Sequence, residues 1–186
     1  IVLLLIIIKR MSEPSDDSET VKKEAINDFS HRTVPSGILG EIALIIDDFG
    51  YRNDDISDGF LYLDAKLTCA VIPGHAHSSS FGKKAIRQGH EVIIHMPMEN
   101  IGENRGEEEF VLQVGMDPDK IKNRVQKAFY QIPEAIGMNN HQGSKATADS
   151  LVMNSVASVL KEQNKFFIDS RTTSKTVAES IMNNWK

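Results

Sequence analysis

The stretch at residues 42–51, IALIIDDFGY, constrains the fold of this chain more than any other. Its five consecutive apolar residues, three of them isoleucine, predict a short buried strand. The strand runs into two adjacent carboxylates, Asp47 and Asp48, and Gly50 then allows the chain to turn. Burying two acids at the end of an apolar strand is costly unless they are solvated, paired or bound to a metal. Because ligands bind at the carboxyl ends of strands in βα sheets, the two acids indicate either a turn with capping residues or a functional site.

Length and composition are those of one globular domain. The chain has 186 residues, of which 40% are hydrophobic and 25% charged, and this suffices for one domain with a core. A net charge of −5 argues against nucleic acid as a partner. The single cysteine, Cys69, excludes an intrachain disulfide and a cysteine-based metal site.

The first ten residues predict a truncated signal peptide or membrane anchor. Residues 1–8 are all aliphatic and are followed by Lys9 and Arg10. This run is too short to span a bilayer, which needs about 20 residues, so it fits part of a signal or anchor segment, with a buried strand as the alternative. Residues 11–39 are polar and predict a linker, with a short helix near 21–29. The folded domain is then expected at 40–186 and outside the cytoplasm, as a secreted, periplasmic or membrane-anchored domain.

From residue 40 onward, predicted strands and helices alternate. Further strands are expected at 67–72, 91–95, 135–138 and 165–169, and helices at 54–63, 78–88, from 117, from 149 and from 175. In the first of these helices Ile56, Phe60 and Leu63 form one apolar face. Apolar strands alternating with helices predict a parallel α/β sheet. Five such units are too few for an eight-stranded barrel, so the sheet is open or lacks the C-terminal strands of a barrel.

Histidines and acids gather after the predicted strands. Of the six histidines, four directly follow a strand: His75, His77, His95 and His141. Imidazole nitrogens and carboxylates are ligands of zinc and similar divalent ions, and three protein ligands leave a position open for water. The pattern therefore predicts a metal site at the carboxyl ends of the strands. His31 and His90 lie elsewhere and are excluded, whereas His75 and His77 fit a solvated loop better than a ligand role.

Five motifs in order resemble the divergent polysaccharide deacetylase family, the YibQ-like proteins: IALIIDDFGY, AVIPGHAHS, GHEVIIHMPME, IGMNNHQGSKAT and FFIDSRTT. The resemblance covers residues 42–178. It implies an irregular (β/α) barrel of the carbohydrate esterase type. It also implies a hydrolase that removes acetyl groups from a polysaccharide or amino sugar with a divalent metal, with zinc as the expected ion.

The resemblance also assigns roles to residues. Asp47 is implied as the general base and Asp48 as a metal ligand. His95 occupies the first histidine position of GHEVIIHMPME, but Glu99 stands where better-studied deacetylases have a second histidine. The third ligand is therefore either Glu99 or His141. We favour His141, because it ends a predicted strand and Gly143 turns the chain directly after it.

The rest of the predicted site is less closely specified. The residues expected to contact substrate or hold the oxyanion are Asn140, Ser144, His77 and Glu99. Asp169 and Arg171 form either a pair that orients a catalytic group or a structural ion pair.

Two other functions fit the same residues. One is a non-catalytic cell-envelope module that binds a glycan or a partner in the same cleft, which the missing second histidine permits. The other is a glycosidase, in which Asp48 acts with Asp169 or Glu99 across a separation of about 5–10 Å. Loss of metal affinity would support the first, and metal-independent release of reducing ends the second.

Overall fold

The computed structural model describes residues 3–8, 41–102 and 106–185. The predicted linker at 11–39, with its short helix, lies outside the described residues. The chain divides into a main unit, Ile1–Leu4 with Leu44–Lys186, and a short unit, Leu5–Ala43. Strand β1 (Leu3–Ile8) occupies the run predicted as a signal or anchor segment. Within the described ranges, no helix combines the length and apolarity needed to cross a membrane, and the anchor stays a prediction.

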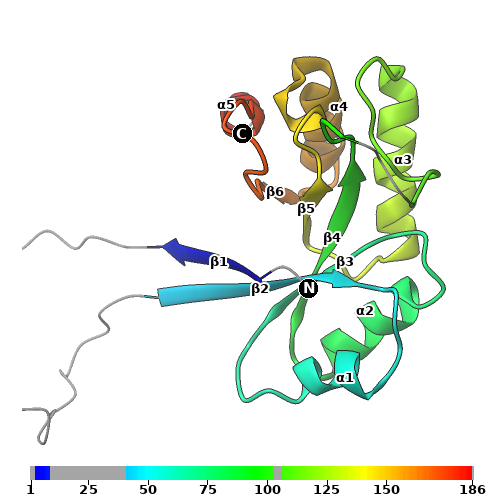
Figure 1. The fold of residues 1–186 in the computed structure, drawn as a ribbon, viewed down its shortest axis with the longest axis vertical. Coiled ribbons are helices and arrows are strands. Elements are labelled where there is room, and N and C mark those ends of the chain that lie inside the picture. The colour runs from blue at the N-terminus through cyan, green and yellow to red at the C-terminus, as the bar shows by residue number, and fades with distance from the viewer. Residues whose placement is uncertain (1–2, 9–40, 103–105, 186) are drawn as a thin grey trace, which may run out of the picture. The chain divides into compact units, whose positions relative to one another are not determined.

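The fold is built on parallel strands that follow one another in sequence order (Figure 1). They are β2 (Glu41–Phe49), β3 (Thr68–Val71), β4 (Glu91–Met98), β5 (Gly137–Gln142) and β6 (Phe166–Ile168). Because crossovers between parallel strands are right-handed, an order without reversal places successive helices on the same face of the sheet. This is the winding of a (β/α) barrel, and the described strands leave it open. The predicted fold class is confirmed.

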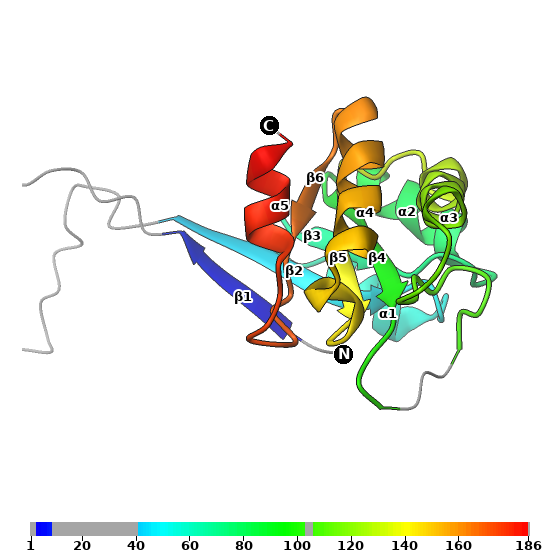
Figure 2. The same ribbon diagram turned by 90° about the horizontal axis from the view of Figure 1, so that it is seen from above.

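The helices follow the strands as the sequence predicts. They are α1 (Asp55–Leu61), α2 (Ser78–Arg87), α3 (Pro118–Gln131), α4 (Ser150–Glu162) and α5 (Ala178–Asn184), with a 3-10 turn η1 (Ala146–Ala148). Asp54, Asp117 and Asp149 cap α1, α3 and α4 by accepting hydrogen bonds from backbone N–H groups of the first turn. Helix α4 packs between α3 and α5 (Figure 2).

The sheet is curled, as an arc of a barrel would be. Strands β2 and β5 are separated by two other strands, which would place them about 14 Å apart in a flat sheet. Nevertheless, the Asn139 Nδ2 group on β5 donates a hydrogen bond of 2.9 Å to Asp47 Oδ1 on β2. Apolar residues such as Ile46 and Ile94 pack into the core on the helix side. The concave face therefore brings polar side chains from β2, β4 and β5 together.

Strand β4 runs to Met98 instead of residue 95, and two other strands, β2 and β5, also extend further than the apolar pattern predicts. Strand β2 continues through both carboxylates to Phe49. Strand β5 starts at Gly137 instead of residue 135 and runs past His141 to Gln142. Apolarity underestimates both strands, because near the mouth of the arc their inner positions carry polar side chains that bond to one another.

Of the apolar face predicted for the first helix, only Phe60 packs against the core, where it is half-buried. The buried residues of α1 are Ser57 and Leu61, whereas Ile56 is 60% exposed and Leu63 49% exposed. The capping box explains this orientation: Asp54 and Ser57 exchange hydrogen bonds that fix the first turn with Ser57 inward. Part of this exposed face borders the site described next.

Candidate metal centre

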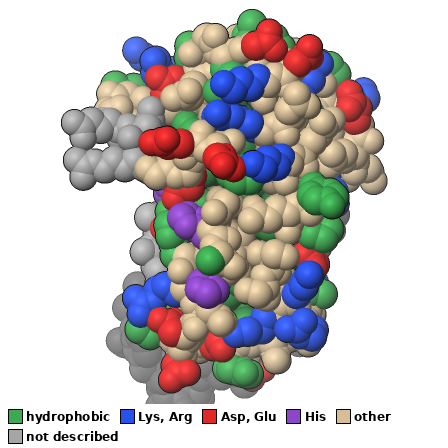
Figure 3. Space-filling view, turned by 90° about the vertical axis from the view of Figure 1, so that its right-hand side faces the viewer, with side chains coloured by type: hydrophobic (Ala, Val, Ile, Leu, Met, Phe, Trp, Pro, Cys, Tyr) green, Lys and Arg blue, Asp and Glu red, His purple; other side chains and the backbone are tan. Residues whose placement is uncertain are grey.

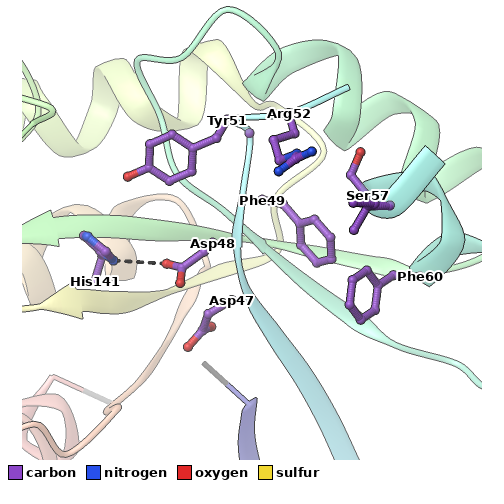
Figure 4. A pocket seen from close by; sticks show the side chains of 10 residues that line it. Asp47, Asp48, Phe49, Tyr51, Arg52, Ser57, Phe60 and His141 are labelled. Carbon is purple, nitrogen blue, oxygen red and sulfur yellow. Dashed lines mark ion pairs between the residues drawn. The ribbon is translucent and has the colours of Figure 1, made fainter. Parts of the chain in front are cut away.

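Three side chains converge at the mouth of the arc: Asp48 from β2, His95 from β4 and His141 from β5. Asp48 Oδ1 lies 3.3 Å from His141 Nδ1 (Figure 4) and 3.3 Å from His95 Nε2. The two nitrogens are 3.2 Å apart. A tetrahedral ion bound at about 2.0–2.1 Å holds its ligand atoms about 3.4 Å apart. The three atoms therefore form a face of the size that a tetrahedral divalent metal requires.

A backbone irregularity directs both acids of β2 to this side. Asp48 has a φ of +69°, and the register between β2 and β3 shifts between Ile46 and Phe49. Such a bulge interrupts the alternation of a strand, so that two consecutive side chains can point the same way. Figure 4 shows Asp47 and Asp48 on the side of β2 that faces His141.

The charge of Asp48 is strongly stabilised. Hydrogen bonding with His141, and next with His95, holds the pKa of the Asp48 carboxyl far below its ordinary value, although partial burial acts in the opposite direction. The carboxylate therefore stays ionised around neutral pH, which is the state that binds a cation.

Asn139 fixes the tautomer of His95. Its Nδ2 faces the Asp47 carboxylate, so its Oδ1 faces His95 Nδ1, at 2.7 Å. An amide oxygen only accepts, so His95 Nδ1 carries a proton, and Nε2 is the nitrogen that faces Asp48 and His141 and is available to a metal ion. Asn139 is completely buried, and β-sheet register sets it beside His95. His141 is held more loosely on its far nitrogen, since Gln142 Nε2 lies 3.4 Å from Nε2.

Replacing Asn139 with Leu is expected to weaken metal binding by about 10–100-fold, because partners of this kind orient a ligating histidine. Competition against a chromophoric chelator measures the affinity. The matched control is Asn140→Leu, since Asn140 is equally buried but bonds to other groups. Equal losses of affinity in both variants would contradict the orienting role.

Of the two candidates for the third ligand, the structure places His141 in the cluster and Glu99 outside it. Glu99 Oε1 lies 2.6 Å from Lys145 Nζ, and its Oε2 accepts the backbone N–H of Val114 at 2.8 Å. Through these two contacts, Glu99 stabilises the loop that follows β4.

Comparison with known proteins agrees with this geometry. The sequence model of a family described as divergent polysaccharide deacetylase matches residues 44–186. The chain belongs to this family. Two curated relatives are the uncharacterized protein YibQ of Escherichia coli (strain K12) and an uncharacterized protein of Haemophilus influenzae (strain ATCC 51907 / DSM 11121 / KW20 / Rd), each 36% identical over 141 residues. The alignments cover 76% of this chain but 44% and 50% of the relatives, so the chain spans about half the length of the curated relatives it matches.

A solved structure shows the same fold. The crystal structure of the uncharacterized protein ATU2773 from Agrobacterium tumefaciens C58 superposes with a TM-score of 0.68 at 17% identity. The match covers 76% of this chain and 58% of that chain. Membership of the divergent polysaccharide deacetylase family thus agrees with a barrel-type arrangement of this sheet.

The residues expected to bind substrate in this family member have other partners. Asn140 donates to the backbone carbonyl of Gln142 and accepts the N–H of Ser170. The Ser144 hydroxyl accepts a backbone N–H from the loop after β4. His77 occupies the position before α2. Their substrate contacts remain predictions, and the bonds of Asn140 and Ser144 support the backbone around the site.

The structure does not bring the side chains of Asp169 and Arg171 together. Asp169 accepts hydrogen bonds from the Thr176 hydroxyl and from the backbone N–H of Arg171. The Arg171 guanidinium lies 3.9 Å from Glu179, where both side chains are exposed and the pair contributes little. Asp169 therefore caps the backbone of the turn after β6, and its predicted pairing with Arg171 stays a prediction.

A second polar cluster, not predicted from the sequence, borders the metal centre. The Glu107 side chain is 3% exposed; its Oε1 accepts a hydrogen bond of 2.5 Å from the Tyr51 hydroxyl and lies 2.8 Å from His75 Nε2. Burial, and then the Glu107 carboxylate, raise the pKa of Tyr51 above its ordinary value. The cluster joins the loops that follow β2, β3 and β4.

Gly50 turns the chain after β2 in a conformation that disfavours other residues. Its φ is +114°, and an added Cβ would lie 2.9 Å from the Ile72 carbonyl oxygen. Gly50→Ala is expected to lower stability by about 1–3 kcal/mol. Gly59→Ala in α1, where a Cβ meets nothing within 4 Å, is expected to be neutral or to stabilise by up to about 1 kcal/mol. Thermal unfolding compares the two variants, and equal melting temperatures would contradict the strain at Gly50.

Proposed function

We propose that this chain is a metal-dependent hydrolase that removes acetyl or related acyl groups from a polysaccharide or amino sugar. The observation that carries the proposal is the triangle of Asp48, His95 and His141 beside a further carboxylate, Asp47. Two imidazoles and one carboxylate form a ligand set of catalytic zinc sites, and zinc is the proposed ion. When bound, the metal supplies Lewis-acid activation of a water molecule and of the acyl carbonyl.

Asp47 is the proposed general base. It lines the same cavity as Asp48 and His141, yet its described contacts are with Asn139 and with the Nδ1 side of His95. Asp47 accepts a proton from the attacking water and passes it to the leaving group. The water oxygen bonds to the acyl carbon, the carbon–nitrogen or carbon–oxygen bond breaks, and the products are a carboxylic acid and an amine or alcohol.

The distribution of charge on one face of the molecule supports a neutral substrate. On the face shown in Figure 3, acidic and basic side chains are interspersed, and histidine side chains reach the surface among them. Such a mixed surface provides no extended positive field for a polyanion.

The test is release of acetate from N-acetylglucosamine oligomers and O-acetylated glycans. Release is expected with zinc, is expected to stop on chelation, and is expected to return when zinc is restored. Binding of these glycans without acetate release would support the non-catalytic envelope module instead. Chelator-resistant release of reducing ends would support the glycosidase.

We also propose that the domain acts outside the cytoplasm. The support is the aliphatic run at residues 1–8, followed by Lys9 and Arg10 and a polar stretch. A reporter enzyme that is active only after export, fused behind residue 186 of the protein as its own gene encodes it, tests this. An inactive but stable fusion would contradict the proposal.

A further inference from the structure

The cavity at the metal centre extends well beyond the space that an acetyl group needs. Its volume is about 310 Å³, at the lower end of the range for small-molecule sites. One end is formed by Asp48 and His141. The other end lies against α1 and is formed by Phe49 and Phe60 (Figure 4). Ile56 of α1 also lines the cavity.

The end against α1 is apolar and firmly built. Phe49 is 5% exposed, stacks on Phe81 with ring centroids 4.3 Å apart, and meets Phe60 edge-on at 5.7 Å. Ile56 completes this wall with a largely exposed side chain. Helix α1 therefore presents apolar side chains, those of Ile56 and Phe60, to the cavity.

The polar groups near this end already have partners. The Ser57 hydroxyl donates to the Asp54 carbonyl and accepts the Asp54 N–H. Arg52, at the mouth, is paired with the Asp54 carboxylate. A sugar ring placed here would lose hydrogen bonds to water without regaining them, which is unfavourable. An alkyl chain carries no such cost.

We infer that this end of the cavity holds the acyl chain of the substrate, and that the enzyme prefers acyl groups of about four to six carbons over acetyl. The inference rests on the proposed hydrolase function and specifies its substrate. The reaction is unchanged: water cleaves the acyl–nitrogen or acyl–oxygen bond and yields a longer carboxylic acid. Each added methylene that enters the apolar end is expected to raise kcat/KM about fourfold.

The test uses the full chain loaded with zinc and p-nitrophenyl acetate, butyrate and hexanoate. Each kcat/KM is divided by the rate constant for hydroxide alone. Butyrate is expected to exceed acetate by about 15-fold. Ile56→Lys is expected to lower the hexanoate-to-acetate ratio about threefold or more, because it replaces part of the apolar wall with a side chain that carries a hydrated ammonium group. Leu63→Lys is the matched control, since Leu63 is an exposed aliphatic residue of the same region that does not line the cavity.

A binding measurement separates this inference from the function on which it rests. Calorimetry with acetohydroxamate, butyrohydroxamate and hexanohydroxamate is expected to show affinity that rises with chain length. If affinity rises with chain length but no ester is hydrolysed, the inferred acyl-chain site is supported and the proposed hydrolase function is contradicted. If the esters are hydrolysed but kcat/KM stays flat or falls with chain length, and the hydroxamate affinities are also flat, the acyl-chain site is contradicted and the hydrolase function is supported. Absence of both binding and hydrolysis would overturn both.

Discussion

Purified protein is expected to bind about one equivalent of zinc, and both His95→Ala and His141→Ala are expected to lose it. Each substitution removes one corner of the triangle formed with Asp48, whose edges measure 3.2–3.3 Å. The affinity should fall by more than the roughly 100-fold that follows from loss of a supporting partner. Metal analysis after gel filtration, together with chelator competition, measures the effect.

Glu99→Gln is the control for this experiment, because Glu99 is the alternative ligand and is bonded to Lys145 instead. It is expected to keep its zinc. If Glu99→Gln and His95→Ala lose zinc while His141→Ala keeps it, the third metal ligand is Glu99 and not His141. Absence of zinc from folded, zinc-supplemented wild-type protein would remove the hydrolase proposal and favour a binding module.

Asp47→Asn is expected to lower turnover by about 10²–10⁴-fold and to leave zinc bound. An amide cannot take a proton from water, but its oxygen can still accept the hydrogen bond from Asn139 Nδ2. The arrangement that orients His95 is therefore preserved while the base is lost. Turnover and zinc content are measured on the same preparation.

Two results would change the role of Asp47. Full turnover in Asp47→Asn would remove it as the base. Parallel loss of zinc and turnover would make it a positioning residue that acts through Asn139 and His95. Asp169→Asn provides a comparison, and a fall as large as that of Asp47→Asn would restore the catalytic role that the sequence suggested for Asp169.

The order of the elements, and the meeting of histidines and acids at one edge of the sheet, could be predicted from sequence because both depend on local patterns. Apolar runs interrupted by caps and glycines gave the alternation of strands and helices. The carboxyl ends of parallel strands share one edge, so residues such as Asp48, His95 and His141 were expected to meet there.

What could not be predicted depends on geometry across strands. Asn139 matters because curling brings β5 to Asp47, and strand register sets it beside His95. Its only signal was its position two residues before His141, on the same face of the strand. Glu107 stood in an acidic loop with nothing to distinguish it from its neighbours, and its burial arises from contacts with Tyr51 and His75.

The metal residues and the apolar wall belong to different parts of the scaffold. Asp48, His95 and His141 lie within strands whose positions are fixed by the sheet, whereas Ile56 and Phe60 lie on a seven-residue helix between two loops. Chemistry and recognition can therefore be exchanged separately. If the proposed function and acyl site hold, transplanting a different α1 segment between β2 and β3 is expected to change the chain-length preference and to leave the proposed metal site in place.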